Sequence, residues 1–166
     1  MAFTKKLIKN KKQMKKLLAI LLIAFSLQGF AQQKDLTWHT DVNKAIELSV
    51  QTGKPLLFFF TGKDWCGPCK MTAKYVFDSN EFAKWSDKLI LVELDFPRKE
   101  PARTNIPAEQ LELARKLGVR SYPTVWFIGT SLKDNQVELK QINKIVGGSR
   151  DAKSWINQAN NMLKNK

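Results

Sequence analysis

Residues 55–70 read PLLFFFTGKDWCGPCK, and this order of side chains predicts a buried strand that leads into a helix. The apolar run at residues 56–60 offers no polar side chain to solvent, as expected of a central strand covered on both faces. Pro68 fits the first turn of a helix, where its missing N–H needs no partner. We therefore expect a strand over residues 55–61, a short loop, and a helix over residues 66–77.

The chain has two cysteines, Cys66 and Cys69, and both lie in this stretch. A cysteine at a helix N-terminus meets unpaired N–H groups and the positive end of the helix dipole, which favour a thiolate. The second cysteine lies one turn further on the same face, so the pair suits thiol–disulfide exchange. The alternatives are that the two cysteines form half of a zinc site or an inert disulfide bridge. Zinc needs three or four cysteine or histidine ligands, and beyond these two cysteines the sequence offers a single histidine, His39.

The hexapeptide at residues 65–70 resembles the active-site motif of the thioredoxins, and Ser121-Tyr122-Pro123-Thr124 is similar to a second motif of that family. The resemblance spans roughly residues 36–164. It implies an α/β thioredoxin fold, with a central mixed β-sheet flanked by helices and an N-terminal β-α extension. It also implies a cis peptide bond before Pro123, facing the cysteines.

The same resemblance assigns roles to the residues of the first motif. Cys66 is expected to be the catalytic nucleophile, and Cys69 the more buried resolving thiol. Trp65, Gly67 and Pro68 are expected to contact the substrate, with the Trp65 ring as a flat surface beside the cysteines. A proline between the two cysteines is associated in this family with reducing proteins.

Two further sites complete the expected active site. Tyr122 and Pro123 are expected to hold an extended client segment, with Tyr122 offering backbone groups in a short β-like pairing. Many thioredoxins carry a buried acid in the strand before the motif, but this strand has none. Glu93 instead interrupts the apolar run at residues 89–94, where burial would favour a protonated carboxyl able to shuttle a proton, as acids do in the C-terminal domain of DsbD-type reductases. The alternative is that Glu93 faces solvent.

Hydrophobic spacing, capping residues and turn residues predict the remaining elements. We expect a short strand within 34–40, a helix over 41–51 capped by Asp41 and ended by Gly53, a short helix from Ser79 to Trp85, a strand over 89–95, an exposed loop over 96–105, a helix over 107–116, a strand over 124–128, a turn over 131–135, a strand over 136–145, and a final helix capped by Ser149 or Asp151.

The first 31 residues differ from the rest of the chain. They contain seven lysines, no acidic residue and an uncharged apolar core at residues 17–25, a pattern typical of a cleavable secretory signal that ends after Ala31. Met1 or Met14 could open it. The formal net charge of +13 then falls to +6, from 21 basic and 15 acidic residues in the domain 32–166. This moderate, scattered charge does not favour nucleic-acid binding.

These observations predict an exported, periplasmic thiol–disulfide oxidoreductase that acts on protein disulfides by reducing them. The resemblance implies no metal, nucleotide or flavin cofactor. A reducing enzyme in an oxidising compartment needs electrons from elsewhere, which implies a membrane thiol reductase as donor. We expect a monomer without stable membrane insertion. A disulfide isomerase or oxidase, or a non-catalytic module that binds peptides, are the alternatives.

Overall fold

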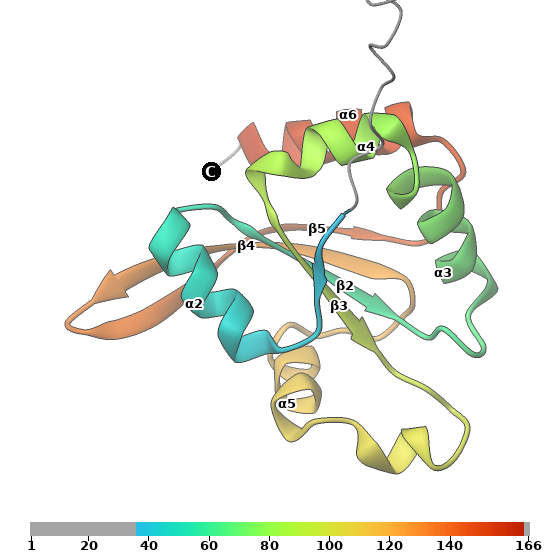
Figure 1. Cartoon of the computed structure of the whole chain (residues 1–166), viewed down its shortest axis with the longest axis horizontal. Helices are drawn as coiled ribbons and strands as arrows, with labels where there is room; N and C mark the ends of the chain where they lie inside the picture. Colours follow the sequence, from blue (N-terminus) through green and yellow to red (C-terminus); the bar gives the residue numbers. More distant parts are fainter. Residues whose placement is uncertain (1–35, 165–166) are drawn as a thin grey trace, which may run out of the picture. The chain divides into compact units, whose positions relative to one another are not determined.

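The computed structural model describes residues 36–164, so the predicted signal at residues 1–31 lies outside the described residues. Its core is a five-stranded mixed sheet with the strand order β1-β3-β2-β4-β5 (Figure 1). The strands are β1 (Trp38–His39), β2 (Leu56–Thr61), β3 (Ile90–Asp95), β4 (Thr124–Lys133) and β5 (Gln136–Val146). The α-helices are α2 (Val42–Thr52), α3 (Gly67–Thr72), α4 (Asn80–Trp85), α5 (Ala108–Lys116) and α6 (Ala152–Lys164).

Strand β2 is the centre of this sheet, as its unbroken apolar sequence predicted. It pairs in parallel with β3 and antiparallel with β4, and all six of its residues are buried. Because a parallel neighbour needs a crossover, the chain passes through α3 and α4 between β2 and β3. This crossover brings the cysteine motif to the carboxyl end of β2, where the chain leaves the sheet.

Helices cover the sheet on both faces, and each face has its own apolar cluster. On one face, helices α3, α4 and α6 pack around Phe59, Phe77 and Trp155, in a cluster that also contains the two cysteines. On the other, α2 and α5 pack around Phe58 and Phe60. The period-2 alternation of side chains along β2 divides its phenylalanines between the two clusters. Figure 1 shows these two helical layers.

The helix boundaries follow the predicted capping residues closely. Asp41 accepts a hydrogen bond from the Lys44 N–H at the start of α2, and Gly53 ends this helix in a left-handed conformation at φ 68°. Ser79 caps α4 in the same way. At α6 the cap is Asp151, whose carboxylate accepts from the Ser154 N–H. These local signals were sufficient because a cap acts within one turn of the chain.

Three predicted segments differ in detail. The helix predicted over 66–77 consists of α3 followed by a π-helical turn, Ala73–Phe77. The predicted loop 96–105 ends in a 3-10 helix, Ala102–Asn105. The turn predicted over 131–135 was too long: Asp134 and Asn135 both take positive φ, so they close a two-residue hairpin turn and β4 continues to Lys133.

Over residues 36–164, none of the helices is both long and apolar enough to cross a membrane.

Candidate functional site

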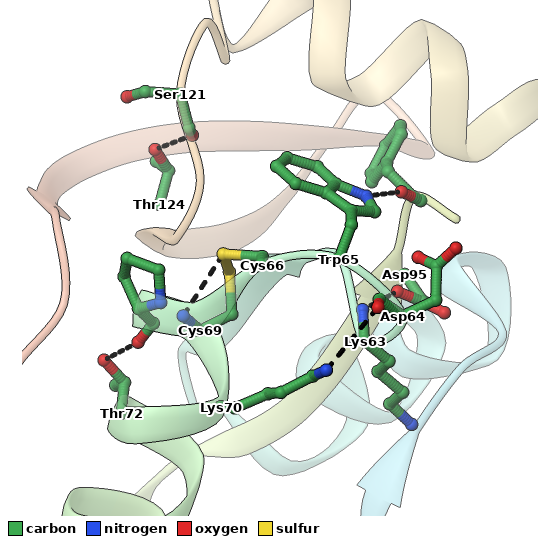
Figure 2. The surroundings of a disulfide bond; sticks show 12 residues. Lys63, Asp64, Trp65, Cys66, Cys69, Lys70, Thr72, Asp95, Ser121 and Thr124 are labelled. Carbon is green, nitrogen blue, oxygen red and sulfur yellow. Dashed lines mark hydrogen bonds between the residues drawn. A yellow bond between two sulfur atoms is a disulfide. The ribbon is translucent and has the colours of Figure 1, made fainter. Parts of the chain in front are cut away.

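A disulfide joins Cys66 and Cys69 at the start of α3 (Figure 2). Cys66 precedes the first helical residue, and its Sγ accepts a hydrogen bond of 3.2 Å from the Cys69 N–H. The first sulfur therefore lies where the helix presents an unpaired donor, as the sequence predicted. Both residues are almost completely buried in this oxidised form, 2% exposed for Cys66 and 1% for Cys69, so the predicted difference in burial is not evident here.

The turn between the cysteines is supported from the loop that precedes α6. Gly67 and Pro68 are exposed, and the Thr72 hydroxyl donates to the Pro68 carbonyl at 3.1 Å. The Ser149 N–H in turn donates to the Thr72 oxygen at 3.0 Å. A Cβ at Gly148 would lie 2.9 Å from the Pro68 Cβ, so a glycine is needed for this close approach. The exposed turn at Gly67 and Pro68 is thus packed closely against the backbone at Gly148 and Ser149.

The second motif forms a turn beside the cysteines. The peptide bond between Tyr122 and Pro123 is cis, as expected from the resemblance. The Thr124 hydroxyl donates to the Ser121 carbonyl at 2.7 Å, which closes this turn at the start of β4 (Figure 2). The Tyr122 ring meets the Trp65 ring edge-on, with centroids 5.4 Å apart. The two motifs, far apart in sequence, therefore meet through the rings of Trp65 and Tyr122.

The Tyr122 phenol lies partly inside this contact. Burial raises its pKa, while the nearby Arg98 guanidinium acts in the opposite direction. Pro123 itself is buried. Within the described part of the chain, the Tyr122 backbone makes no hydrogen bond to another residue.

Trp65 is more firmly held than an ordinary half-buried aromatic residue. Its indole Nε1 donates to the Phe96 carbonyl at 2.8 Å. The Arg98 guanidinium lies 3.6 Å from the centre of its ring, which is close contact for a cation on an aromatic face. Gly62 leaves room for the ring on the side where a Cβ would clash with it. Trp65 is thus fixed between its own loop and the segment that follows β3.

Glu93 does not lie in the apolar setting that the sequence predicted. It is opposite Phe59 in the register of β2 and β3, so it is on the cysteine face of the sheet. Its side chain is 20% exposed, however, and the Lys63 ammonium lies 2.6 Å from its carboxylate. This pair lines a cleft of about 290 Å³ near the start of α5. The Glu93 carboxylate is therefore ion-paired and partly exposed to solvent, because the loop after β2 brings Lys63 back over β3.

The sequence did not reveal the role of the segment after β3. Phe96 and Arg98 lie in the segment 96–105, which the sequence predicts to be an exposed loop. In the structure, the Asp64 carboxylate accepts hydrogen bonds from the backbone N–H groups of Arg98 and Lys99. No local signal predicts this contact, because it joins loops more than 30 residues apart.

The remaining tryptophans pack in the core. Trp38, Trp85, Trp126 and Trp155 all contact one of the two apolar clusters. His39 lies in β1. Among residues 36–164, no three of the His, Cys, Asp and Glu side chains gather in a way that could hold a metal ion.

The fold and the site together resemble those of thiol–disulfide oxidoreductases, and the sequence comparison identifies the family. Residues 42–134 match the family described as "Thioredoxin-like domain". This match covers more than half of the chain, and the chain belongs to this family.

Two proteins of Chlamydia pneumoniae are similar to this chain in sequence. "Thioredoxin-related protein DsbJ" is 36% identical over 114 residues, which cover 65% of this chain and 33% of that protein. "Disulfide bond reductase DsbH" is 34% identical over 95 residues, 57% of either chain. The chain therefore matches only about a third of the first relative and just over half of the second.

Solved structures support the same fold. "DsbH Oxidoreductase" superposes with a TM-score of 0.60 at 27% identity, over 86% of this chain and 99% of that one. A thioredoxin from Thermus thermophilus superposes with a TM-score of 0.59 at 18% identity, over 78% and 88% of the two chains, which shows likeness of fold alone.

Proposed function

We propose that this protein reduces disulfide bonds of exported client proteins by dithiol–disulfide exchange at Cys66 and Cys69. The observation that carries the proposal is the disulfide at the start of α3, beside the open backbone of Tyr122. A pair of sulfurs three residues apart closes too small a loop to stabilise the fold much, so its value is chemical. The name of the similar DsbH protein, a disulfide bond reductase, supports the reducing direction.

The reaction begins with the reduced protein. The Cys66 thiolate attacks one sulfur of a client disulfide, and the other client sulfur leaves as a thiolate that takes up a proton. Cys69 then loses its proton and attacks the Cys66 sulfur of the mixed disulfide, which releases the second client thiolate. Two electrons have passed to the client, and the protein holds the Cys66–Cys69 disulfide seen in the structure. The Cys69 N–H, 3.2 Å from the Cys66 sulfur, stabilises negative charge on it.

The client would bind across the rim of the site. Gly67 and Pro68 are exposed beside the disulfide, and the rings of Trp65 and Tyr122 form the neighbouring surface. An extended client segment could pair with the free backbone of Tyr122, next to the buried Pro123, which would hold the target sulfur near Cys66.

Glu93 as proton carrier for Cys69 stays a prediction. Its place on the cysteine face of the sheet supports it, while its ion pair with Lys63 is a competing role.

We further propose that residues 1–31 are a cleaved signal, that residues 32–166 are the working domain, and that this domain acts as a monomer in the periplasm. The lysine-rich start and the apolar segment after it support export. Regeneration then requires an external dithiol, for which a membrane thiol reductase is the proposed donor.

Three measurements on the mature protein test the proposal. Cys66→Ser should abolish reduction of insulin-type disulfides, whereas a protein that only binds peptides would keep its affinity. Cys69→Ala should trap clients as mixed disulfides that mass spectrometry can identify. The reduction potential should lie near that of thioredoxin, about −270 mV, and a value near −120 mV would instead assign an oxidase. Absence of an alkylation-sensitive thiol in the reduced protein would refute the proposal.

A further inference from the structure

The segment after β3 is fastened to the cysteine loop at several points. Trp65 donates from Nε1 to the Phe96 carbonyl at 2.8 Å. The Asp64 carboxylate accepts from the backbone N–H of Arg98 at 3.1 Å and from that of Lys99 at 3.0 Å. Hydrogen bonds to a carboxylate are among the stronger ones in proteins. The backbone of Arg98 therefore has a defined position relative to the cysteines.

This position places the Arg98 side chain at the client surface. Its guanidinium lies over the ring of Trp65, which immediately precedes Cys66, at 3.6 Å from the ring centre. The same ring contacts Tyr122, and the charge of Arg98 acts on the Tyr122 phenol. The cation is thus next to both elements that we propose to hold the client.

The charge of Arg98 is not neutralised within the described part of the protein. None of the ion pairs among residues 36–164 includes it. Two acids of the joined segments have other partners: the Asp64 carboxylate accepts backbone N–H groups, and Glu100 pairs with Arg103 at 2.6 Å. An exposed guanidinium stacked on an aromatic ring is still able to bind a carboxylate with its outer N–H groups.

Two further cationic residues are adjacent in sequence to the cysteine motif and to the Tyr122 turn. Lys70 comes directly after Cys69, and Arg120 precedes the turn that contains Tyr122; both are exposed. The acid at the end of β3, Asp95, is engaged by the Lys63 N–H at 2.8 Å. Among the ion pairs of residues 36–164, none includes Arg98, Lys70 or Arg120, so three unpaired cations surround the disulfide. Asp64 and Asp95 keep their charge, but their carboxylates are turned to backbone N–H groups.

From this arrangement, and resting on the proposed function, we infer that Arg98 is a specificity-determining residue. It selects client segments that carry an acidic side chain within a few residues of the target cysteine. Complementary charge at a docking surface raises the association rate and rejects partners of the same sign.

The test compares two peptides that differ at one pair of positions. Each carries a single cysteine as its mixed disulfide with neutral 2-thiopyridine, flanked by two glutamates or by two lysines. Reduced Cys69→Ala protein is mixed with each peptide; the Cys66 thiolate bonds to the peptide sulfur, and thiopyridone leaves with the electron pair and is followed by its absorbance. Because Cys69 is absent, the second-order rate constant reports the first exchange step alone.

We expect the glutamate peptide to react about tenfold faster than the lysine peptide at low ionic strength, and the ratio to fall several-fold in high salt. Arg98→Gln, made in the same Cys69→Ala protein, should lower the ratio at least threefold, and Arg98→Glu should lower it further. Arg115→Glu, the same charge change at an exposed position on α5, is the matched control and should retain the ratio.

The outcomes separate the inference from the proposed function. Equal rates with both peptides, or a ratio that Arg98→Gln leaves unchanged, would overturn the inference while leaving exchange at Cys66 intact. Equal slowing of both peptides by Arg98→Gln would show that Arg98 only supports Trp65, and this too would overturn it. No reaction with either peptide would refute the proposed function together with the inference.

Discussion

Substitution of Gly62 by alanine tests how the loop before the cysteines is held. A Cβ at this position would lie 2.4 Å from two atoms of the Trp65 indole, Cε2 and Nε1. Ordinary carbon contacts are about 3.5–4.0 Å, so the ring must retreat by about 1 Å. It has little freedom to do so, because Nε1 is bonded to the Phe96 carbonyl and the Arg98 guanidinium covers one ring face.

The cost follows from these contacts. Overpacking of this kind typically destabilises a protein by about 1–3 kcal/mol. Loss of the Trp65–Phe96 hydrogen bond would add about 1 kcal/mol. Replacing glycine by alanine also lowers the conformational entropy of the unfolded chain, which offsets the loss by stabilising the folded state by about 0.4–1 kcal/mol. We therefore expect the free energy of unfolding to fall by about 2 kcal/mol, a decrease in Tm of roughly 8 °C for a domain of this size.

Urea unfolding of the oxidised protein measures this change. Gly67→Ala is the matched control: a Cβ there meets no heavy atom within 4 Å, so only the entropy gain of about 0.4–1 kcal/mol remains and stability should not fall. In a Trp65→Ala background the Gly62→Ala cost should largely disappear, because the clashing ring is gone. A cost that persists in that background, or a Gly62→Ala protein as stable as the control, would refute the reasoning.

Three further predictions concern capping, pH and proton transfer. Ser79→Ala removes the side-chain cap of α4 and should lower the free energy of unfolding by about 1 kcal/mol in urea titrations. Partial burial alone would raise the pKa of Asp64, but the backbone N–H groups of Arg98 and Lys99 hold it below its ordinary value of 3.8. The folded state thus binds a proton at Asp64 less readily than the unfolded state does. The contribution of Asp64 to stability is therefore present above pH 3.8 and is lost as the pH falls through the lowered pKa. Asp64→Asn should remove the part of the acid dependence of stability that comes from this carboxylate. Glu93→Gln should slow resolution of the mixed disulfide about tenfold and leave the alkylation rate of the first cysteine unchanged, as measured by quenched-flow and iodoacetamide labelling.

Each of these three predictions can be contradicted by a specific measurement. A Ser79→Thr protein should keep the cap, so equal losses in the alanine and threonine variants would contradict the capping argument. Parallel stability curves for the wild type and Asp64→Asn in acid would contradict the pKa argument. Equal resolution rates in the wild type and Glu93→Gln would leave Glu93 with its ion pair to Lys63 as its role.

The sequence alone determined the centre of the fold and the reacting atoms. The apolar run in β2, the proline at the start of α3 and the caps Asp41 and Ser79 act within a few residues of their own position, so their effects can be predicted without the rest of the chain. The two cysteines and the turn around Tyr122 were predicted as one site through a family resemblance, and the contact between Trp65 and Tyr122 agrees with it.

The surroundings of that site depended on contacts between distant loops. Glu93 lies in a strand that reads as buried, yet the loop after β2 brings Lys63 to it and opens the pair to solvent. Arg98 belongs to a polar segment with no recognisable motif, and it meets Trp65 only because parallel strands β2 and β3 end at the same edge of the sheet. Periodicity and capping carry no information on which two loops meet at such an edge, because that choice is made by the packing of the whole sheet.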